Sequence, residues 1–406
     1  MLENRKSGEG RAARTGDAPA APLGIERPLV IALVVDTIGN KGNGISNSAL
    51  QYARELERQG HTVRLVGIGA PEYRARVKRV PLVSWVAAKQ QMQFAQPSES
   101  LFRRAFDGVD VVHIYLPFSF GRCALKVARR MGIPVTAGFH LQPENVTYSA
   151  GPLKYLPGIS NFLYALFRFW LYRRIDHIHA PTEMIAGQLR AHGYKAKLHV
   201  ISNGYRAMFT PKRQRPADAP APVPFRVIAS GRLTHEKDHI TLIKAVARCR
   251  HADDIRLVIA GTGPLQRYLR FRARLLLGRS ADIGFHPNAG MPELLRSCDL
   301  FVHPSIVDIE SLSVIEGMAS GLVPVIAAAE LSAAGQFALL DESLFPARDV
   351  VTLAQRIDWW IDHPAELSAW GQRYAEHTKE HYSVESSVRK FVAMEREAIA
   401  DSRVLS

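Results

Sequence analysis

Cysteine is scarce in this sequence of 406 residues. The three cysteines, Cys123, Cys249 and Cys298, lie far apart and have no metal-ligand spacing. Such a pattern excludes a disulfide scaffold and a cysteine-based zinc site. We therefore expect free thiols and a cytoplasmic protein.

Long apolar runs are also missing. No run approaches the ~20 consecutive apolar residues that a membrane-spanning helix needs. Residues 1–27 are rich in Gly, Ala, Pro and charge and lack the apolar core of a secretory signal. A disordered tail is expected there.

Acidic residues are scarce in the first half of the chain but not in the second. Residues 28–223 carry 26 Lys and Arg against 11 Asp and Glu, whereas residues 224–406 carry 21 against 23. The net charge of +14 therefore comes mainly from the first half. A surface that basic attracts polyanions, which include an anionic membrane, nucleic acid and phosphorylated substrates.

What is present is an alternation of short apolar strands and amphipathic helices, typical of an α/β protein with parallel sheets. A Pro/Ala-rich stretch at 211–224 has the composition of a linker. The predicted organisation is a tail at 1–27, a first Rossmann-like domain at 28–210, a linker at 211–224, a second Rossmann-like domain at 225–375, and a C-terminal helix at 376–406.

The most informative stretch begins after a buried strand that ends at His303. It contains the acids Asp308, Glu310 and Glu316, and its helix ends at Gly321. Carboxylates at the carboxyl end of a parallel strand suit a ligand rich in hydroxyl groups, because each carboxylate accepts strong charge-assisted hydrogen bonds. The alternative is that these acids only cap a helix.

A second stretch carries two cations. Arg232 and Lys237 follow a strand that begins at Phe225, and a helix begins behind them near Ile240. Backbone donors, the helix dipole and two cations together form a site for a diphosphate. The alternative is a solvated basic turn.

Taken together, these stretches resemble the retaining family-4 glycosyltransferases of the GT-B fold. Asp308 and Glu316 have the family's spacing of two acids with seven residues between them, followed by a helix of small residues, Gly321 and a Pro-Val strand. The resemblance implies two Rossmann-like domains that face a central cleft and a C-terminal helix that crosses back to the first domain. Where the family has Gly-Phe-Gly after the first acid, this sequence has Ile-Glu-Ser, so either Asp308 or Glu310 holds the sugar.

The resemblance also implies roles for single residues. Arg232 and Lys237 would hold the leaving diphosphate, Glu316 the nucleotide ribose, and His140 the donor sugar. No metal and no cofactor are expected, because the two cations offset the phosphate charge, and the co-substrate is a UDP- or GDP-linked sugar. Further contacts to the donor are expected from Gly42, Gly44, Gly231, Gly263, Leu265, Phe285, Ser311 and Leu312.

Two histidines end strands of the first domain. His113 is expected to be an ordinary hydrogen-bonded residue. His140 heads a polar loop, and in that loop Glu144 and Asn145 either contact the acceptor or only support the loop.

An aromatic segment that ends in arginines, residues 155–174, has two interpretations. It is either a core helix or a helix in the membrane interface, with aromatic rings at headgroup depth and arginines on anionic lipid. The basic first domain favours the membrane. The acceptor would then be a membrane lipid such as diacylglycerol, as in bacterial glycolipid-forming members, at the inner face of the plasma membrane; a soluble acceptor is the alternative.

The favoured function is transfer of a hexose from a nucleotide sugar to an acceptor hydroxyl with retention of configuration. The alternatives are a basic anionic-surface or nucleic-acid binding protein on an inactive GT-B scaffold, and a sugar-nucleotide epimerase. No nucleic-acid partner is expected, because the arginines accompany neither an aromatic platform for single strands nor a recognition helix.

Overall fold

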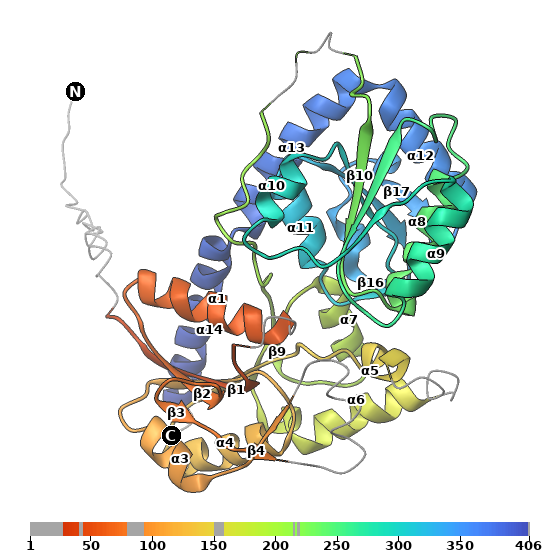
Figure 1. The fold of residues 1–406 in the computed structure, drawn as a ribbon. Helices are drawn as coiled ribbons and strands as arrows, with labels where there is room; N and C mark the ends of the chain where they lie inside the picture. Colours follow the sequence, from red (N-terminus) through yellow and green to blue (C-terminus); the bar gives the residue numbers. More distant parts are fainter. Residues whose placement is uncertain are drawn as a thin grey trace, which may run out of the picture.

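The computed structural model describes residues 27–39, 44–78, 93–149, 158–213, 216 and 220–404. These residues form two α/β domains, and a long C-terminal helix returns from the second domain to the first (Figure 1). Of the expected tail only Arg27 is described, and residues 214–215 and 217–219 of the expected linker are outside the described residues. The boundaries given above therefore stay predictions.

Domain 1 is built on a seven-stranded sheet in the order β3-β2-β1-β6-β7-β8-β9, in which all neighbours are parallel. The central strand β1 is buried along almost its whole length, as expected for a parallel sheet with helices on both faces. The strands are β1 (Val30–Thr37), β2 (Thr62–Ile68), β3 (Tyr73–Arg74), β6 (Val111–Ile114), β7 (Val135–Gly138), β8 (His177–Ala180) and β9 (Lys197–Val200).

The helices of domain 1 connect these strands. Two of them begin at side-chain caps, where the Ser98 and Thr182 hydroxyls accept backbone N–H groups of the first turn. The helices are α1 (Gly44–Arg58), α3 (Glu99–Ala105), α4 (Ser119–Arg130), α5 (Pro143–Ser149), α6 (Ile159–Trp170) and α7 (Glu183–Ala191), and a short antiparallel pair joins β4 (Val77–Lys78) to β5 (Phe94–Ala95).

Domain 2 repeats this plan with six parallel strands in the order β12-β11-β10-β13-β15-β17. The strands are β10 (Phe225–Ser230), β11 (Ile255–Ala260), β12 (Asp282–Gly284), β13 (Leu300–His303), β15 (Val323–Ala328) and β17 (Leu344–Pro346), with a separate pair of β14 (Val307–Asp308) and β16 (Leu331–Ser332). The helices are α8 (His239–Val246), α9 (Gln266–Leu277), α10 (Met291–Arg296), α11 (Leu312–Ala319), α12 (Val350–Asp362) and α13 (Pro364–Tyr382).

The C-terminal helix α14 (Val384–Val404) belongs to the core of domain 1, although it follows domain 2 in the chain. It packs against α1, β7 and β8, whereas α13 packs on domain 2 (Figure 1). The break between the two helices falls at Ser383. The expected α/β fold, its two domains and the helix that crosses back are confirmed.

A buried polar contact fastens α14 to the sheet. The Glu395 carboxyl is fully buried and accepts hydrogen bonds from the Thr136 hydroxyl at 2.8 and 3.0 Å. The His113 Nδ1 atom lies 3.1 Å from the same carboxyl. Burial raises the pKa of Glu395 to about 8, so the returning helix docks on domain 1 largely with a neutral acid.

Residues 202–206, called the crossing segment here, connect the domains and touch both of them. The Tyr52 hydroxyl and the Gln51 amide of α1 donate to backbone carbonyls of this segment at 2.6 and 2.9 Å. On the other side, the Tyr205 backbone bonds to Tyr382 and Val384, at the break between α13 and α14. Gly204 has a φ of +72°, and a Cβ atom there would lie 2.6 Å from the Val384 Cα.

We predict that Gly204→Ala lowers the free energy of unfolding by roughly 1–3 kcal/mol, because both the left-handed backbone and the contact with α14 exclude a side chain. Denaturant titration followed by circular dichroism measures it. Gly187→Ala is the matched control, since Gly187 lies within α7 with open space around it; it should stabilise the helix by up to about 1 kcal/mol. Equal stabilities of wild type and Gly204→Ala would contradict the prediction.

Candidate active site

An ion pair between two loops of domain 2 lies at the centre of the candidate site. The Lys237 ammonium, in the turn after β10, donates to the Asp308 carboxylate at the end of β14. Both side chains are largely buried, at 15% and 12% exposure. They meet because β10 and β13 are neighbours in the sheet, and the loops after parallel strands gather at one edge.

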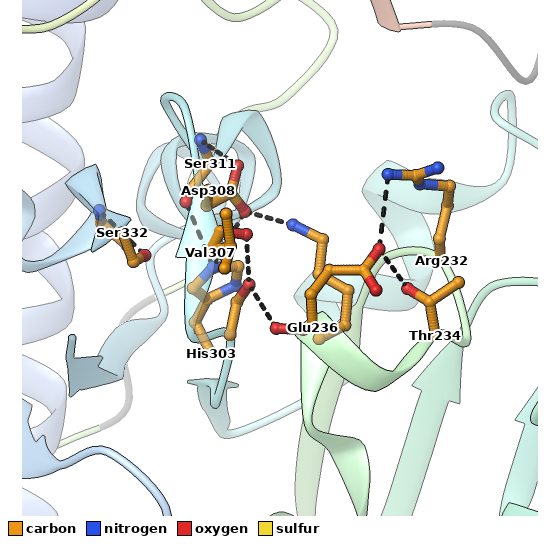
Figure 2. A network of polar contacts seen from close by, with 11 residues as sticks. Arg232, Thr234, Glu236, His303, Val307, Asp308, Ser311 and Ser332 are labelled. Carbon is orange, nitrogen blue, oxygen red and sulfur yellow. Dashed lines mark hydrogen bonds and ion pairs between the residues drawn. The ribbon is translucent and has the colours of Figure 1, made fainter. Parts of the chain in front are cut away.

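Other polar groups orient Asp308 (Figure 2). The His303 Nε2 atom lies 3.2 Å from Asp308 Oδ2, and the Ser311 backbone N–H donates to Oδ1 at 3.2 Å. Burial by itself would raise the pKa of Asp308, but the charge of Lys237 and the hydrogen bond from His303 outweigh it and hold that pKa well below its usual range. Asp308 is therefore a fixed anion.

His303 was not among the predicted site residues. Its signal in the sequence was its place at the end of a buried strand, directly before Pro304. The Ser311 hydroxyl lies 3.1 Å from the same His303 Nε2 atom, so the histidine connects Asp308 to the start of α11. Ser311 itself has a φ of +68°, a strained conformation for a residue with a side chain. Ser311 caps α11 and Leu312 is its first residue, and the donor contacts expected of both stay predictions.

Arg232 is held in the same turn as Lys237 (Figure 2). A guanidinium nitrogen lies 3.5 Å from the buried Glu236 carboxylate, which also accepts the Thr234 hydroxyl at 2.6 Å. The Glu236 backbone carbonyl accepts two further bonds from Ser305 and Ile306, in the segment that leads to β14. Glu236, which the sequence reasoning did not single out, thus organises the turn that carries both cations.

The two predicted glycine turns of domain 2 lie against each other. A Cβ atom on Gly263 would lie 2.4 Å from the Leu233 carbonyl oxygen, so the close approach of the two loops requires glycine there. The Leu265 N–H donates to the same carbonyl at 3.0 Å. Gly231 begins the Arg232 turn, and a Cβ there would lie 3.8 Å from the Lys237 side chain. Phe285, expected near the base, is 70% exposed after β12.

Glu310 points to domain 1 and not to the ion pair. Its carboxylate accepts the Ser202 hydroxyl at 2.6 Å, the Asn203 backbone N–H at 2.8 Å and also the Asn203 side-chain amide. The neighbouring Ile309 carbonyl accepts the Thr182 hydroxyl of domain 1 at 3.1 Å. Of the two acids that the sequence left open, Asp308 is therefore the one beside Lys237, and Glu310 joins the domains.

Glu316 lies on α11 and is only partly exposed, at 23%. The Arg206 guanidinium of the crossing segment lies 3.7 Å from its carboxylate. Burial raises the pKa of Glu316 to about 7, and the charge of Arg206 opposes that rise. Within the described part of the chain, Glu316 makes no direct contact with Arg232 or Lys237.

None of the described predicted residues of domain 1 forms a hydrogen bond or ion pair with Lys237 or Asp308. The His140 ring stacks on Tyr115 with centroids 5.0 Å apart, and burial holds the pKa of His140 well below its usual range. The helix that follows, α5, packs against β14, the short strand that ends at Asp308. Gly44 begins α1 with open space around it, while Gly42 is outside the described residues.

The polar loop after His140 is tied to α6. The Tyr164 hydroxyl donates to the Glu144 carboxyl at 3.2 Å, and burial raises the pKa of Glu144. The side chain of Asn145 lies outside the described residues. A role of this loop in acceptor binding stays a prediction.

The fold and the site together define a class. Two parallel-sheet domains carry cations, an anchored carboxylate and a partly buried acid at the edge where they meet, and a returning helix closes the first domain. This architecture is the GT-B fold, the fold of the glycosyltransferase family that the sequence resembles.

Comparison with protein families and known proteins identifies the family. A model described as Glycosyltransferase Family 4 matches residues 42–207, and one described as Glycosyl transferases group 1 matches residues 212–377. The chain therefore belongs to the family-4 glycosyltransferases.

Among curated relatives, a GDP-mannose-dependent alpha-mannosyltransferase of Corynebacterium glutamicum is 26% identical and covers 83% of this chain and 82% of its own. The alpha-monoglucosyldiacylglycerol synthase of Streptococcus pneumoniae is 25% identical over 73% of this chain and 70% of its own. Two solved structures, each 16% identical, share the fold: sucrose-phosphate synthase from Thermosynechococcus elongatus (TM-score 0.71, 92% of this chain, 100% of that chain) and Anabaena HepE in complex with UDP and glucose (TM-score 0.64, 90% and 98%).

We predict that Glu310 makes the stability of the protein depend on pH. Burial raises the pKa of Glu310 from 4.5 to about 7, so between these values the folded protein retains a proton that the unfolded chain has released. A rise in pH through this range therefore favours unfolding by on the order of 1–3 kcal/mol through this one group.

Urea titrations at several pH values test this with Glu310→Gln, whose free energy of unfolding should fall less between pH about 4.5 and about 7 than that of the wild type. Glu57→Gln on the exposed face of α1 is the control and should follow the wild type. Parallel pH curves for the wild type and Glu310→Gln would show that Glu310 has no such effect.

Proposed function

We propose that this protein is a retaining, metal-independent hexosyltransferase that moves a sugar from a UDP- or GDP-linked donor to the hydroxyl group of a membrane lipid such as diacylglycerol. The observation that carries the proposal is the buried Lys237–Asp308 pair, whose lysine lies in the same turn as Arg232. The pair sets a cation, which suits phosphate, next to a carboxylate, which suits sugar hydroxyls. A sugar diphosphate likewise has its phosphates next to its sugar.

The cations supply the stabilisation that the reaction needs. As the bond from the anomeric carbon to the diphosphate breaks, negative charge grows on the leaving group. Arg232, with a guanidinium that is 41% exposed, and Lys237 can meet that charge without a metal ion. Glu236 holds the turn that carries both, so little reorganisation is needed when the charge develops.

The carboxylate and the histidine would orient the sugar. Asp308 is an anion held from several sides and can accept hydroxyl hydrogen bonds, while His140 is neutral and would act by hydrogen bonding and shape. A fixed sugar sets the angle at which the acceptor hydroxyl attacks. The acceptor hydroxyl would attack on the face from which the diphosphate leaves, without a protein nucleophile.

The known relatives support the donor class. The name of the mannosyltransferase specifies GDP-mannose, and HepE was solved with UDP and glucose. Uridine and guanosine diphosphate sugars should therefore both be tested as donors. Glu316 is the residue assigned to the ribose, since a partly exposed carboxylate at α11 can accept ribose hydroxyls.

We predict that Lys237→Ala and Glu316→Ala each lower kcat/KM for sugar transfer by on the order of 10²–10³-fold, the effect of removing one preorganised group from a charged transition state. Donor hydrolysis and transfer, measured over a panel of UDP- and GDP-linked sugars, give the rates. Lys244→Ala is the control, because Lys244 is an exposed lysine on α8, and it should keep the wild-type rate.

Wild-type rates in Lys237→Ala or Glu316→Ala would refute the assigned site. Calorimetric titration of the wild type with UDP and with GDP adds an independent measurement. If neither nucleotide binds, the chain is better described as an anionic-surface binding protein on an inactive scaffold.

The lipid acceptor is supported by a patch of exposed apolar side chains on α6. Phe162, Leu166, Phe169 and Trp170 are between 38% and 60% exposed and recur at helical spacing, while Tyr164 and Phe167 bury the opposite face. The segment from residue 145 to 175 contains no acidic residue. These four exposed residues are called the α6 patch.

Arginines surround the α6 patch. The Arg122 guanidinium lies 4.3 Å from the Trp170 ring centroid, and Arg173 lies 4.0 Å from that of Phe169. The pKa of Arg174 is lowered by partial desolvation and by the positive charges of its arginine neighbours. Aromatic rings within a cluster of cations match the interface of an anionic bilayer, where rings enter the headgroup layer and guanidinium groups meet phosphates.

No helix among the described residues has the length and apolar character needed to cross a bilayer. The α6 patch and its arginines support a proposed peripheral location on the inner face of the plasma membrane.

We predict that the full-length protein floats with vesicles that contain anionic phospholipid, and that Phe162→Ser combined with Phe169→Ser reduces the bound fraction at least several-fold. Each buried aromatic contributes on the order of 1.5–3 kcal/mol. Phe271→Ser on α9 of domain 2 is the matched control, because Phe271 is 65% exposed but lies in the other domain. Equal flotation of all variants, or binding to neutral vesicles alone, would remove the lipid proposal and leave a soluble acceptor.

A further inference from the structure

Three histidines of domain 1 converge at one place beneath the polar loops. His113 lies on β6, His140 directly after β7 and His179 on β8, which are successive strands of the sheet. One ring nitrogen from each residue lies within 4.8 Å of the other two. All three side chains are buried, with 0%, 9% and 1% exposure.

Two nitrogens of this histidine group have no partner. The Nε2 atoms of His113 and His140 are buried and make no hydrogen bond. Both lie beside Gly138: a Cβ atom on this glycine would lie 2.2 Å from Nε2 of His140 and 3.2 Å from Nε2 of His113. The missing side chain at Gly138 therefore leaves room for two imidazole edges. A buried polar atom without a partner is uncommon and requires an explanation.

The opposite nitrogens are anchored. His113 Nδ1 lies 2.8 Å from the Thr136 hydroxyl and 3.1 Å from the Glu395 carboxyl. His179 Nε2 lies 2.6 Å from the Ile201 carbonyl oxygen, which leaves its Nδ1 as the available atom. Histidine ligands of metal ions are commonly held in this way, with one nitrogen on a carboxylate or carbonyl and the other toward the metal.

We propose that His113, His140 and His179 bind one divalent transition-metal ion, with zinc the first candidate. Three imidazole nitrogens suit zinc and its neighbours in the first transition row and do not suit magnesium or calcium. The ion would join the ends of β6, β7 and β8 to the Glu395 contact of α14. It would also fix the ring of His140, the residue expected to face the donor sugar.

The protonation states agree with this geometry. Burial lowers the pKa of His113 and of His179 to about 3 and holds that of His140 well below its usual range. The rings are neutral at neutral pH, so each carries a lone pair that can bind a metal ion.

A second group of possible ligands, His177, His199 and Glu397, lies between β8, β9 and α14. Its groups already satisfy one another: His177 Nδ1 lies 3.0 Å from His199 Nε2, and His177 Nε2 lies 3.0 Å from Asp401. The Lys197 ammonium donates to Glu397. Among the described residues, no nitrogen of this group is both shielded from solvent and without a hydrogen-bond partner, and the group serves as the competing site in the test.

The test uses the full-length protein, stripped with a chelator and titrated with Zn²⁺ and with Co²⁺. We expect one equivalent of metal per chain, a visible d–d absorption from cobalt in a low-symmetry nitrogen site, and a rise in the melting temperature with zinc. His179→Gln and His140→Gln should each reduce the affinity at least 10-fold. X-ray absorption of the zinc-loaded wild type should show imidazole nitrogens and no sulfur, which keeps the test valid if a variant folds poorly.

Two matched variants control the test. His239→Gln removes a histidine of domain 2 that is equally buried, with both ring nitrogens unpartnered, but that belongs to neither group of possible ligands, and it should bind metal as the wild type does. His199→Gln removes a member of the competing group and should also leave binding unchanged. Loss of binding in His199→Gln with retention in His179→Gln would overturn the proposal, as would a wild type that binds no more metal than His179→Gln. None of these measurements depends on sugar transfer.

Discussion

The ion pair between Lys237 and Asp308 is the interaction on which the domain-2 site depends. Each charge is largely removed from water, and neither would be stable there without the other. The pair joins the turn after β10 to the segment after β13, and His303 and Ser311 extend it to the start of α11. The network therefore holds the first turn of that helix and the cationic turn in one arrangement before any ligand binds.

The same acidic loop also connects the two domains. Two residues beyond Asp308, Glu310 receives three hydrogen bonds from Ser202 and Asn203, and Thr182 donates to the carbonyl between the two acids. A change in the position of the ion pair would therefore be transmitted directly to the crossing segment. The loop from Asp308 to Glu310 therefore ties the ion pair of domain 2 to the residues that lead out of domain 1.

Domain 1 has a different character. Its excess of basic residues, the exposed rings of the α6 patch and the nearby arginines all lie in the half of the chain that the fold separates from the Lys237 site. Its interior also holds buried histidines and the buried acid Glu395, which domain 1 tolerates because burial favours their neutral forms. A basic surface and buried polar packing are thus combined in domain 1, whereas Arg232 and Lys237 lie in domain 2.

Much of the fold and part of the candidate site could be predicted from the sequence, because they depend on local patterns of residues. Apolar runs that end in turns determine parallel strands, and the residues after those strands gather at one sheet edge, so Arg232, Lys237 and Asp308 could be placed together from their positions alone. The basic first half was equally clear from the sequence, whereas the return of the C-terminal helix to domain 1 was expected from the family resemblance and the break at Ser383 was not predicted. Only the tertiary structure decided which partner each acid faces, since Glu310 contacts Asn203, which is 107 positions away in the chain. It also decided that His113, His140 and His179 lie together, because β6, β7 and β8 are neighbours in the sheet. Such contacts depend on strand order and domain placement, because burial energies summed over the whole fold select them, and no local pattern encodes them.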